Sequence, residues 1–255
     1  MNAEGRFPVR VPPFRGVIPF FWTELRVQLH ESTAIYTSMI IQVVLLVFVR
    51  ILDPALLGVA LVGALIFSVF ALGQRVQNEA AFVRIDHKLN ELYLASPLSP
   101  EGYFLGMALG VLVAYLGPIA VLAGVAEWVL RLGALSWGTL LLVAGAVWVF
   151  SSSIGYIVST LFKDMRTIWP YASLFYNLFG VLPPVFYPLA FFPVALRPVA
   201  LMMPPSAAAA LVQTTIDPGW LTTDQVVLAA VALGLEAALV FLFAVYWARR
   251  TVRES

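Results

Sequence analysis

The chain of 255 residues has hydrophobic residues at 61% of its positions, charged residues at only 11%, and no cysteine. This composition leaves too little polar side chain to cover a soluble globule of this size, and it excludes disulfides and thiolate metal sites. We therefore expect an integral membrane protein. The two histidines, His30 and His87, are too isolated to form a metal centre or a catalytic pair.

Six apolar segments are each long enough to cross a hydrocarbon core of about 30 Å as a helix. Segments of this length, uniformly apolar and rich in Ala, Leu, Val and Gly, are typical of membrane helices and not of barrel strands. The sequence predicts one all-α domain over residues 1–255, with transmembrane helices over residues 34–52, 55–73, 103–126, 135–162, 168–187 and 225–247.

The segment 17–31 precedes the first apolar segment and has the periodicity of an amphipathic helix. The apolar residues at helical spacing are Ile18, Phe21, Trp22, Leu25 and Leu29, and the polar residues opposite them are Glu24, Gln28 and Glu31. This segment is either an interfacial helix that lies along the membrane surface or an ordinary amphipathic helix packed on its own protein.

The mostly polar stretch from Gln74 to Gly102 separates the second and third apolar segments. An apolar stripe predicts a short cytoplasmic helix over residues 77–93, and the stripe consists of Phe82, Ile85, Leu89 and Leu92. Ser99, Pro100 and Glu101 are typical of a helix start, because they supply a cap, a first-turn proline and an early acid. The predicted helix either lies on lipid headgroups or fits a groove on another protein.

Residues 182–218 contain eight prolines but remain too apolar for a solvated linker. Irregular backbone at membrane depth needs protein or water to satisfy its polar groups. We expect short helices, broken at Pro188, Pro193 and Pro198, that form a re-entrant region over residues 188–218 on the outer side of the membrane.

The fifteen Lys and Arg residues are divided unequally between the two sides of such a bundle. Six spans place both termini on one side, which then also has Arg6, Arg10, Arg15, Arg26, Arg75, Arg84, Lys88, Lys163, Arg166, Arg249, Arg250 and Arg253. The opposite side has only Arg50, Arg131 and Arg197. By the positive-inside rule, we expect a multi-pass protein of the cytoplasmic (inner) membrane with both termini in the cytoplasm.

Polar residues are rare within the predicted spans. Glu236 lies near the middle of the sixth span, where a charged carboxylate costs roughly 2.5–3.5 kcal/mol on insertion scales. It is either a proton, cation or substrate site, or a protonated or hydrogen-bonded residue that fixes the sixth helix to its neighbours. The serines at positions 151–153 are more typical of close helix packing than of a transport path.

Several short runs carry a family resemblance that covers the whole chain. The run LNELYLASPLSPEGYFLG, from Leu89 to Gly106, resembles the loop between spans two and three in permease subunits of the ABC-2 type exporter family. Four later runs are similar to that family's signature around span five and the following external loop: LFKDMR (161–166), PVFYP (184–188), FP (192–193) and MPPS (203–206). One departure is the sequence RIDHKLN from Arg84, where many members have a Glu followed by Gly-Thr.

The resemblance implies a transport subunit without enzymatic activity or a cofactor of its own, driven by a separate ATPase subunit that binds ATP and Mg²⁺. The sequence agrees, because neither of its lysines, Lys88 and Lys163, follows a phosphate-binding glycine-rich loop. The helix over residues 77–93 would then be a coupling helix in a cleft of the ATPase. Its contact residues would be Phe82, Arg84, Ile85, Asp86, Leu89, Glu91 and Leu92.

The resemblance also implies a second permease copy, more readily a homodimer than a heterodimer, in contact with membrane lipid and without a nucleic-acid partner. Residues that would line the substrate pathway are Tyr36, Gln42, Tyr171, Tyr176, Asn177 and Glu236. An external gate would contain Pro184, Phe186, Tyr187, Pro188, Phe192 and Pro193, although these residues could equally form a structural lid.

The expected cargo is a hydrophobic or amphipathic molecule such as a drug, a lipid or a lipid-linked glycan. Two other functions remain open from the residues alone: an ion-coupled secondary transporter that uses Glu236, and a membrane assembly protein that transports nothing. The first is disfavoured because the proline breaks cluster in one half of the chain, whereas many secondary transporters have paired broken helices in both halves.

Overall fold

The computed structural model describes residues 12–30, 32–85 and 98–254, and every regular element within these ranges is a helix. The helices are α1 (Val17–His30), α2 (Ser32–Leu52), η1 (Pro54–Leu56), α3 (Leu57–Ile85), α5 (Pro100–Leu130), α6 (Ala134–Ser159), α7 (Met165–Val181), η2 (Leu189–Phe191), η3 (Val194–Leu196), α8 (Arg197–Met202), α9 (Pro204–Ile216) and α10 (Thr223–Glu254). The η elements are short 3-10 helices. The predicted all-α fold is confirmed for the described residues.

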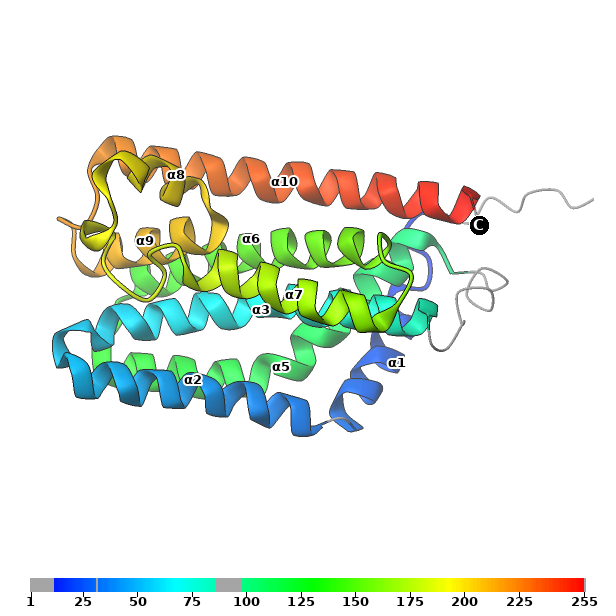
Figure 1. Cartoon of the computed structure of the whole chain (residues 1–255), viewed down its shortest axis with the longest axis horizontal. Coiled ribbons are helices and arrows are strands. Elements are labelled where there is room, and N and C mark those ends of the chain that lie inside the picture. Colours follow the sequence, from blue (N-terminus) through cyan, green and yellow to red (C-terminus); the bar gives the residue numbers. More distant parts are fainter. Residues whose placement is uncertain (1–11, 31, 86–97, 255) are drawn as a thin grey trace, which may run out of the picture.

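Six long helices, α2, α3, α5, α6, α7 and α10, run along the bundle in alternating directions (Figure 1). Within the described residues, four segments are long and apolar enough to cross a membrane: Pro54–Ile85, Pro100–Leu130, Ala134–Ser159 and Thr223–Arg250. A fifth is added if the bent pair of α8 and α9 counts as one span. Six spans are therefore not confirmed. One reason is that α7 has only 17 residues, and Pro183 and Pro184 follow shortly after its end.

Helix α3 continues through the boundary that we expected between the second span and the cytoplasmic helix. It runs unbroken from Leu57 to Ile85, so residues 77–85 extend the apolar helix and do not begin a separate one. No proline interrupts this stretch, and Gly73 is part of the helix and packs closely against α6. The remainder of the predicted coupling helix, residues 86–93, lies outside the described residues.

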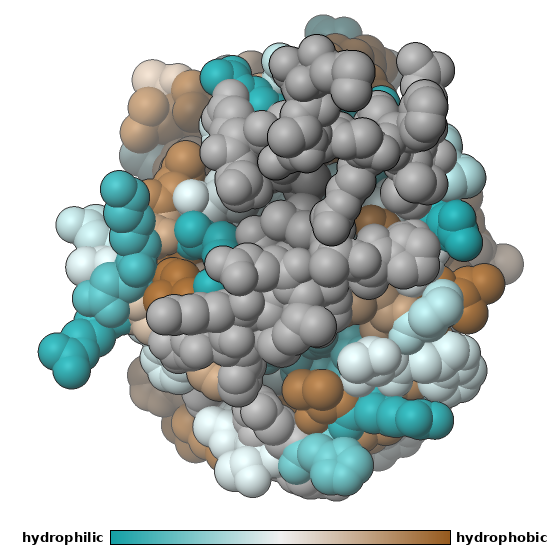
Figure 2. Space-filling view, turned by 90° about the vertical axis from the view of Figure 1, so that its right-hand side faces the viewer, coloured by the Kyte–Doolittle hydropathy of each residue, from teal (hydrophilic) through white to brown (hydrophobic). Residues whose placement is uncertain are grey.

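One end of the bundle brings together several of the basic segments. The right-hand end in Figure 1 contains α1, the end of α3, the turn between α6 and α7, and the end of α10. Arg84 lies in the last turn of α3, Lys163 lies in the α6–α7 turn and Arg166 in the first turn of α7, and Arg249 and Arg250 lie near the end of α10. Figure 2 looks onto this end and shows hydrophilic residues around its rim.

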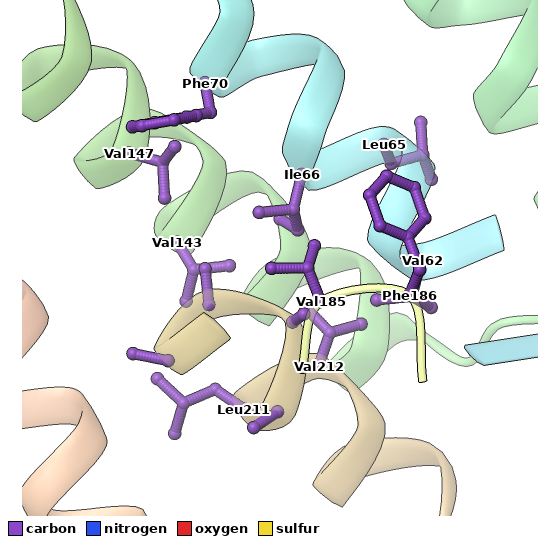
Figure 3. Close-up of a cluster of buried hydrophobic side chains, with 14 of the residues drawn as sticks. Val62, Leu65, Ile66, Phe70, Val143, Val147, Val185, Phe186, Leu211 and Val212 are labelled. Atoms are coloured by element: carbon purple, nitrogen blue, oxygen red, sulfur yellow. The ribbon is translucent and has the colours of Figure 1, made fainter. Parts of the chain in front are cut away.

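Helix α3 is the centre of the larger apolar core, which the close-up in Figure 3 shows. Its side chains meet those of α6, of the segment after α7, and of α9. The residues in contact include Val62, Leu65, Ile66 and Phe70 of α3, Val143 and Val147 of α6, Val185 and Phe186 after α7, and Leu211 and Val212 of α9.

Two glycines allow α3 and α6 to approach until their backbones touch. A Cβ on Gly155 of α6 would collide with the carbonyl oxygen of Gly73, and a Cβ on Gly73 would collide with the carbonyl group of Ser151. Tyr176 of α7 is buried beside this crossing, and its hydroxyl donates a hydrogen bond to the carbonyl oxygen of Ser151 at 3.0 Å. Small residues at a helix crossing are the usual means of close packing in lipid, where burial of apolar surface gives little driving force.

The predicted start of α5 is confirmed in detail. Ser99 caps the helix by accepting a hydrogen bond from the Gly102 amide at 3.0 Å, Pro100 is in the first turn, and Glu101 is the early acid. Glu101 is buried and forms an ion pair with Arg249, which fixes the beginning of α5 to the end of α10.

The proline-rich segment after α7 forms short helices that fold back into the core. Helices α8 and α9 meet at an angle of 100° around Met203, which directly precedes Pro204 and Pro205. Ten consecutive residues of α9, from Pro204 to Gln213, are buried. The short helices agree with the predicted re-entrant region, although the sharp break falls at Met203 and not at the three earlier prolines.

Helix α1 packs against α5 through apolar and polar side chains together, and its buried residues are Phe20, Glu24, Leu25 and Gln28. Gly102, Gly106 and Gly110 form a strip of the α5 surface that has no side chains, and we call this strip the glycine ridge. It lets α1 approach closely, since a Cβ on Gly110 would lie 2.6 Å from the Cβ of Glu24. Glu24 and Gln28 are buried there and are joined by a hydrogen bond of 2.8 Å. The exposed residues of α1 include Ile18, Trp22, Val27 and Leu29. Arg26 and His30 are exposed on α1 as well, so this packing does not separate the two predictions for the segment, an interfacial helix and an amphipathic helix packed on its own protein.

The Gly73–Gly155 crossing predicts different effects for two glycine substitutions in α6. Gly155→Ala places a methyl group against the α3 backbone and is expected to cost about 1–3 kcal/mol through overpacking. In Gly145→Ala the new Cβ has no atom within 4 Å, so the better helix propensity of Ala should leave stability unchanged or raise it by up to about 1 kcal/mol. Thermal unfolding of the purified variants in detergent measures both effects, and equal melting temperatures would contradict the close crossing.

Candidate functional site

A groove with a volume of about 970 Å³ runs along the bundle between α2, α3, α5 and α7. We call it the long groove. It exists because α2 is only loosely packed: among its described residues, Ile35 and Leu46 are the buried hydrophobic ones. The helix therefore forms a wall at some distance from its neighbours and leaves space that no side chain of the described residues fills.

Most of the long groove is apolar. One part of its lining comes from Val43, Leu46 and Val47 of α2 and from Leu122, Val125 and Trp128 of α5. Phe67 and Leu72 of α3 form the wall between these two helices. An apolar lining of this kind suits the hydrocarbon part of a ligand, with a small number of polar groups elsewhere to fix its orientation.

The polar part of the long groove is concentrated on α3. Gln74, Arg75, Asn78 and Glu79 all line it, and we call these four residues the α3 polar cluster. They occupy positions i, i+1, i+4 and i+5 of one helix and therefore share one face. The cluster has one positive and one negative side chain, so it offers both hydrogen-bond donors and acceptors without a net charge.

Neighbouring helices support the α3 polar cluster through defined contacts. Gln74 Nε2 donates a hydrogen bond to Ser173 Oγ of α7 at 3.1 Å, and Asn177 Nδ2 donates to the Ser173 carbonyl oxygen at 2.7 Å. The Arg75 guanidinium lies over the ring of Tyr115 of α5, 5.6 Å from its centroid. A cation at this distance from an aromatic ring is attracted to its face, so Tyr115 helps to hold Arg75 at the groove.

Asn78 differs from its neighbours because one of its polar atoms has no partner. Its Oδ1 atom is buried and accepts no hydrogen bond from any described residue. Buried side-chain acceptors in proteins nearly always have a donor, so an unsatisfied one in the wall of a groove indicates a position where a ligand or water supplies it.

The α3 polar cluster lies at a definite depth in the bundle. At a rise of 1.5 Å per residue, Gln74 is about 26 Å along the helix axis from Leu57, where α3 begins. The apolar stretch before the cluster therefore nearly matches a hydrocarbon core of about 30 Å. If α3 crosses a bilayer, the cluster lies at the headgroup boundary on the side that contains α1.

The residues that we expected along a substrate pathway are not all brought together. Asn177 lines the long groove beside Ser173. Tyr171 is exposed on α7 and its ring packs 5.5 Å from that of Phe162, whereas Tyr176 is buried at the α3–α6 crossing. The positions of Tyr36 and Gln42 fall on α2, which forms a wall of the groove, but their side chains lie outside the described residues.

Glu236 lies on α10 and is not among the residues that line the long groove. Its Oε2 atom is buried and has no hydrogen-bond partner among the described residues. The described residues contain no group of three His, Asp or Glu side chains that could hold a metal ion.

Of the residues expected to contact an ATPase, Phe82, Arg84 and Ile85 are described, and all three lie in the last turns of α3. Phe82 is partly exposed and also lines the end of the long groove. The expected contacts Asp86, Leu89, Glu91 and Leu92 lie outside the described residues.

Arg84 has a role within the chain that the sequence did not reveal. Its guanidinium donates hydrogen bonds to the carbonyl oxygens of Ser159 and Phe162, at the end of α6 and in the turn that follows. A cation at the C-terminal end of a helix satisfies carbonyl groups that have no partner in the helix and interacts favourably with its dipole. On the other side, Trp247 of α10 donates to Thr160 Oγ1 at 2.8 Å, so the α6–α7 turn is held between α3 and α10.

The residues of the expected external gate lie at the end of the bundle opposite α1, and several are packed into the core. Pro184 and Phe186 are buried, and the Phe186 ring lies 5.6 Å from that of Phe67, which lines the long groove. Pro188 and Pro193 precede the 3-10 helices η2 and η3. The remaining residues of this set are Tyr187, whose hydroxyl donates to the Leu182 carbonyl, and Phe192, whose carbonyl accepts a hydrogen bond from Arg197 at 3.1 Å.

Sequence reasoning missed the α3 polar cluster because it assigned these residues to a cytoplasmic segment beyond the second span. The signal was present in the i, i+4 repetition of Gln74 with Asn78 and of Arg75 with Glu79. Ser173 was also missed, and no pattern in the sequence connects it to Gln74, because their contact joins residues 99 positions apart.

A scan against models of known protein families gives no match, and a search of curated proteins finds no similar chain. The functional interpretation therefore depends on the residues and on the geometry of the long groove.

The contacts of Arg84 predict a local effect on the isolated chain. In Arg84→Met the α6–α7 turn loses its donor, and since hydrogen bonds to a charged group contribute about 1.5–3 kcal/mol, the melting temperature should fall and amide exchange in residues 159–166 should become faster. The exposed Arg166 provides a matched control, because Arg166→Met removes a cation from the same turn and should change neither quantity. Unchanged amide exchange in Arg84→Met would mean that Arg84 does not hold the turn.

Proposed function

We propose that this chain is the transmembrane permease subunit of an ATP-driven exporter of the ABC-2 type, which moves a hydrophobic or amphipathic molecule out of the cytoplasm or the inner leaflet. The observation that carries the proposal is the long groove, which changes from apolar to polar along α3 and ends beside Phe82. A path of this kind suits an amphipathic cargo and connects it to the segment expected to receive force from an ATPase.

The distribution of basic residues supports the direction of transport. The helix ends at the α1 side of the bundle carry Arg84, Arg166 and Arg249 among other cations, which favours a cytoplasmic position for this side. The chain would then be a multi-pass protein of the inner membrane with both termini in the cytoplasm. The outward apolar residues of α1 would contact lipid at the cytoplasmic surface.

The motor in this proposal is a separate ATPase subunit that binds ATP and Mg²⁺, and this chain itself catalyses no reaction. Force applied near residues 82–92 would reach the long groove along α3. Because Arg84 holds the α6–α7 turn, the same force would also reach α7, whose Ser173 and Asn177 face the α3 polar cluster.

A second permease copy completes the proposed transporter. α2 and α7, which both form walls of the long groove, also expose large apolar side chains, including Val44 and Phe48 of α2 and Leu174 and Leu178 of α7. Lipid or an identical chain would cover these surfaces, and a homodimer requires only the chain described here.

The two alternatives have less support. An ion-coupled transporter that uses Glu236 would need this residue near the substrate path, and Glu236 does not line the long groove. A membrane assembly protein that transports nothing would not explain a groove of about 970 Å³ whose lining is apolar along one part and polar along another.

Co-purification with the ATPase tests the proposal. We expect the chain to be isolated from its native membrane together with a protein that contains a Walker motif, and we expect Phe82→Asp combined with Leu89→Asp to abolish this association, because two charges would replace apolar contacts. Phe191→Asp combined with Val194→Asp is the matched control, since both residues are exposed at the opposite end of the bundle. Retention of the ATPase by the first variant, with both variants folded, would contradict the coupling assignment.

A further inference from the structure

We propose that the long groove binds one amphiphile with a zwitterionic head of the phosphoethanolamine kind, with the head at the α3 polar cluster and the hydrocarbon tail between α2 and α5. This inference rests on the proposed function, because it names the class of molecule that the transporter would carry. It is argued from the polarity, the depth and the hydrogen-bonding groups of the groove.

The distribution of polarity fixes which way the amphiphile lies. The α3 polar cluster is confined to residues 74–79, whereas the described lining nearer the start of α3 is mainly apolar, includes Leu46, Leu122 and Trp128, and has Arg50 of α2 as its one charged residue. A molecule that is apolar throughout would leave the α3 polar cluster without a suitable partner. The tail therefore points away from the end of the bundle that contains α1.

The depth of the cluster matches a lipid-like orientation. The cluster begins about 26 Å along α3 from Leu57, close to the thickness of a hydrocarbon core. A bound amphiphile would thus keep its head at the level of the headgroups and its tail at the level of the acyl chains. It could pass from the leaflet into the long groove beside the loosely packed α2 without turning over.

The volume limits the size of the occupant. At about 970 Å³ the long groove is at the upper end of the range for small-molecule sites, roughly 300–1,000 Å³. This space suits a single amphiphile and is too small for an extended polymer.

The hydrogen-bonding groups select the head. Asn78 Oδ1 is a buried acceptor without a donor, and the carboxylate of Glu79 lines the same wall, so this side of the cluster suits an ammonium group with N–H donors. Arg75, held over Tyr115, suits a phosphate, since guanidinium donors match its oxygens. A head that joins an ammonium group to a phosphate by a short link would place the ammonium at Asn78 and Glu79 and the phosphate at Arg75. Such a head has no net charge, and neither does the α3 polar cluster.

The test uses two probes that differ only in whether the nitrogen of the head carries three hydrogens or three methyl groups. Myristoyl lysophosphatidylethanolamine and myristoyl lysophosphatidylcholine have the same tail and the same charges, but the trimethylated nitrogen of the second has no N–H group. Equilibrium binding of each radiolabelled probe to the purified, folded chain without its ATPase should show at least tenfold tighter binding of the ethanolamine probe. The reason is that the loss of one hydrogen bond between a charged donor and a polar acceptor lowers binding affinity by about tenfold or more.

Three variants connect the preference to Asn78. In Asn78→Leu, which keeps the approximate size but removes the acceptor, both probes should bind with similar affinity. In Gln77→Leu, the matched control at the neighbouring buried position of α3, which does not line the long groove, the preference should persist. Asn78→Asp keeps an acceptor at this position and should retain the preference. The melting temperature of each variant without probe checks that it remains folded.

Three outcomes would overturn the inference: equal affinity of both probes for the unmodified chain, an unchanged preference in Asn78→Leu, or no binding of either probe because a second copy of the chain fills the groove in a cross-linked dimer. Each of these leaves the ATPase association untouched. Conversely, a chain that prefers the ethanolamine probe but never associates with an ATPase would contradict the proposed function alone.

Discussion

The close crossing of α3 and α6 determines how the other helices can pack. Gly73 and Gly155 bring the two backbones into contact. Tyr176 of α7 packs beside this crossing, where its hydroxyl donates a hydrogen bond to the carbonyl oxygen of Ser151. In lipid, burial of apolar surface contributes little to helix association, so contacts of this closeness are a main source of stability. Because α3 is fixed to α6 and α7 on one side, its other side faces α5 and the loosely packed α2, and the long groove opens between these helices.

Two parts of the bundle place polar side chains inside and large apolar side chains outside, and both placements suit a membrane. Helix α1 buries Glu24 and Gln28, together with Phe20 and Leu25, against the glycine ridge of α5 and exposes Ile18 and Trp22. The long groove encloses the α3 polar cluster while α2 exposes apolar side chains to its surroundings. In water these arrangements would be costly, whereas a bilayer and its interface provide an apolar partner for the outward faces. The fold therefore supports a path through the protein that is more polar than its exterior.

The sequence predicted those features that depend on local chemistry. The helical character of the apolar segments, the cap at Ser99 and the short helices of the proline-rich region follow from residue length, hydrogen bonding and proline sterics, and the structure has all of them. The unbroken α3 was not predicted, because polarity was taken as the end of the helix although nothing at Gly73 stops it. Arg84 and Ser173 depend on contacts between distant parts of the chain, which a single sequence does not contain.

The orientation of α3 across the membrane is the claim on which the rest of the account depends, and cysteine labelling tests it directly. The chain has no cysteine of its own, so Arg166→Cys, at the α1 end, and Phe191→Cys, at the opposite end, each report a single exposed position. With a membrane-impermeant maleimide on intact cells, the account predicts labelling of the Phe191→Cys variant, and labelling of the Arg166→Cys variant only after permeabilisation. Labelling of the Arg166→Cys variant in intact cells would contradict it.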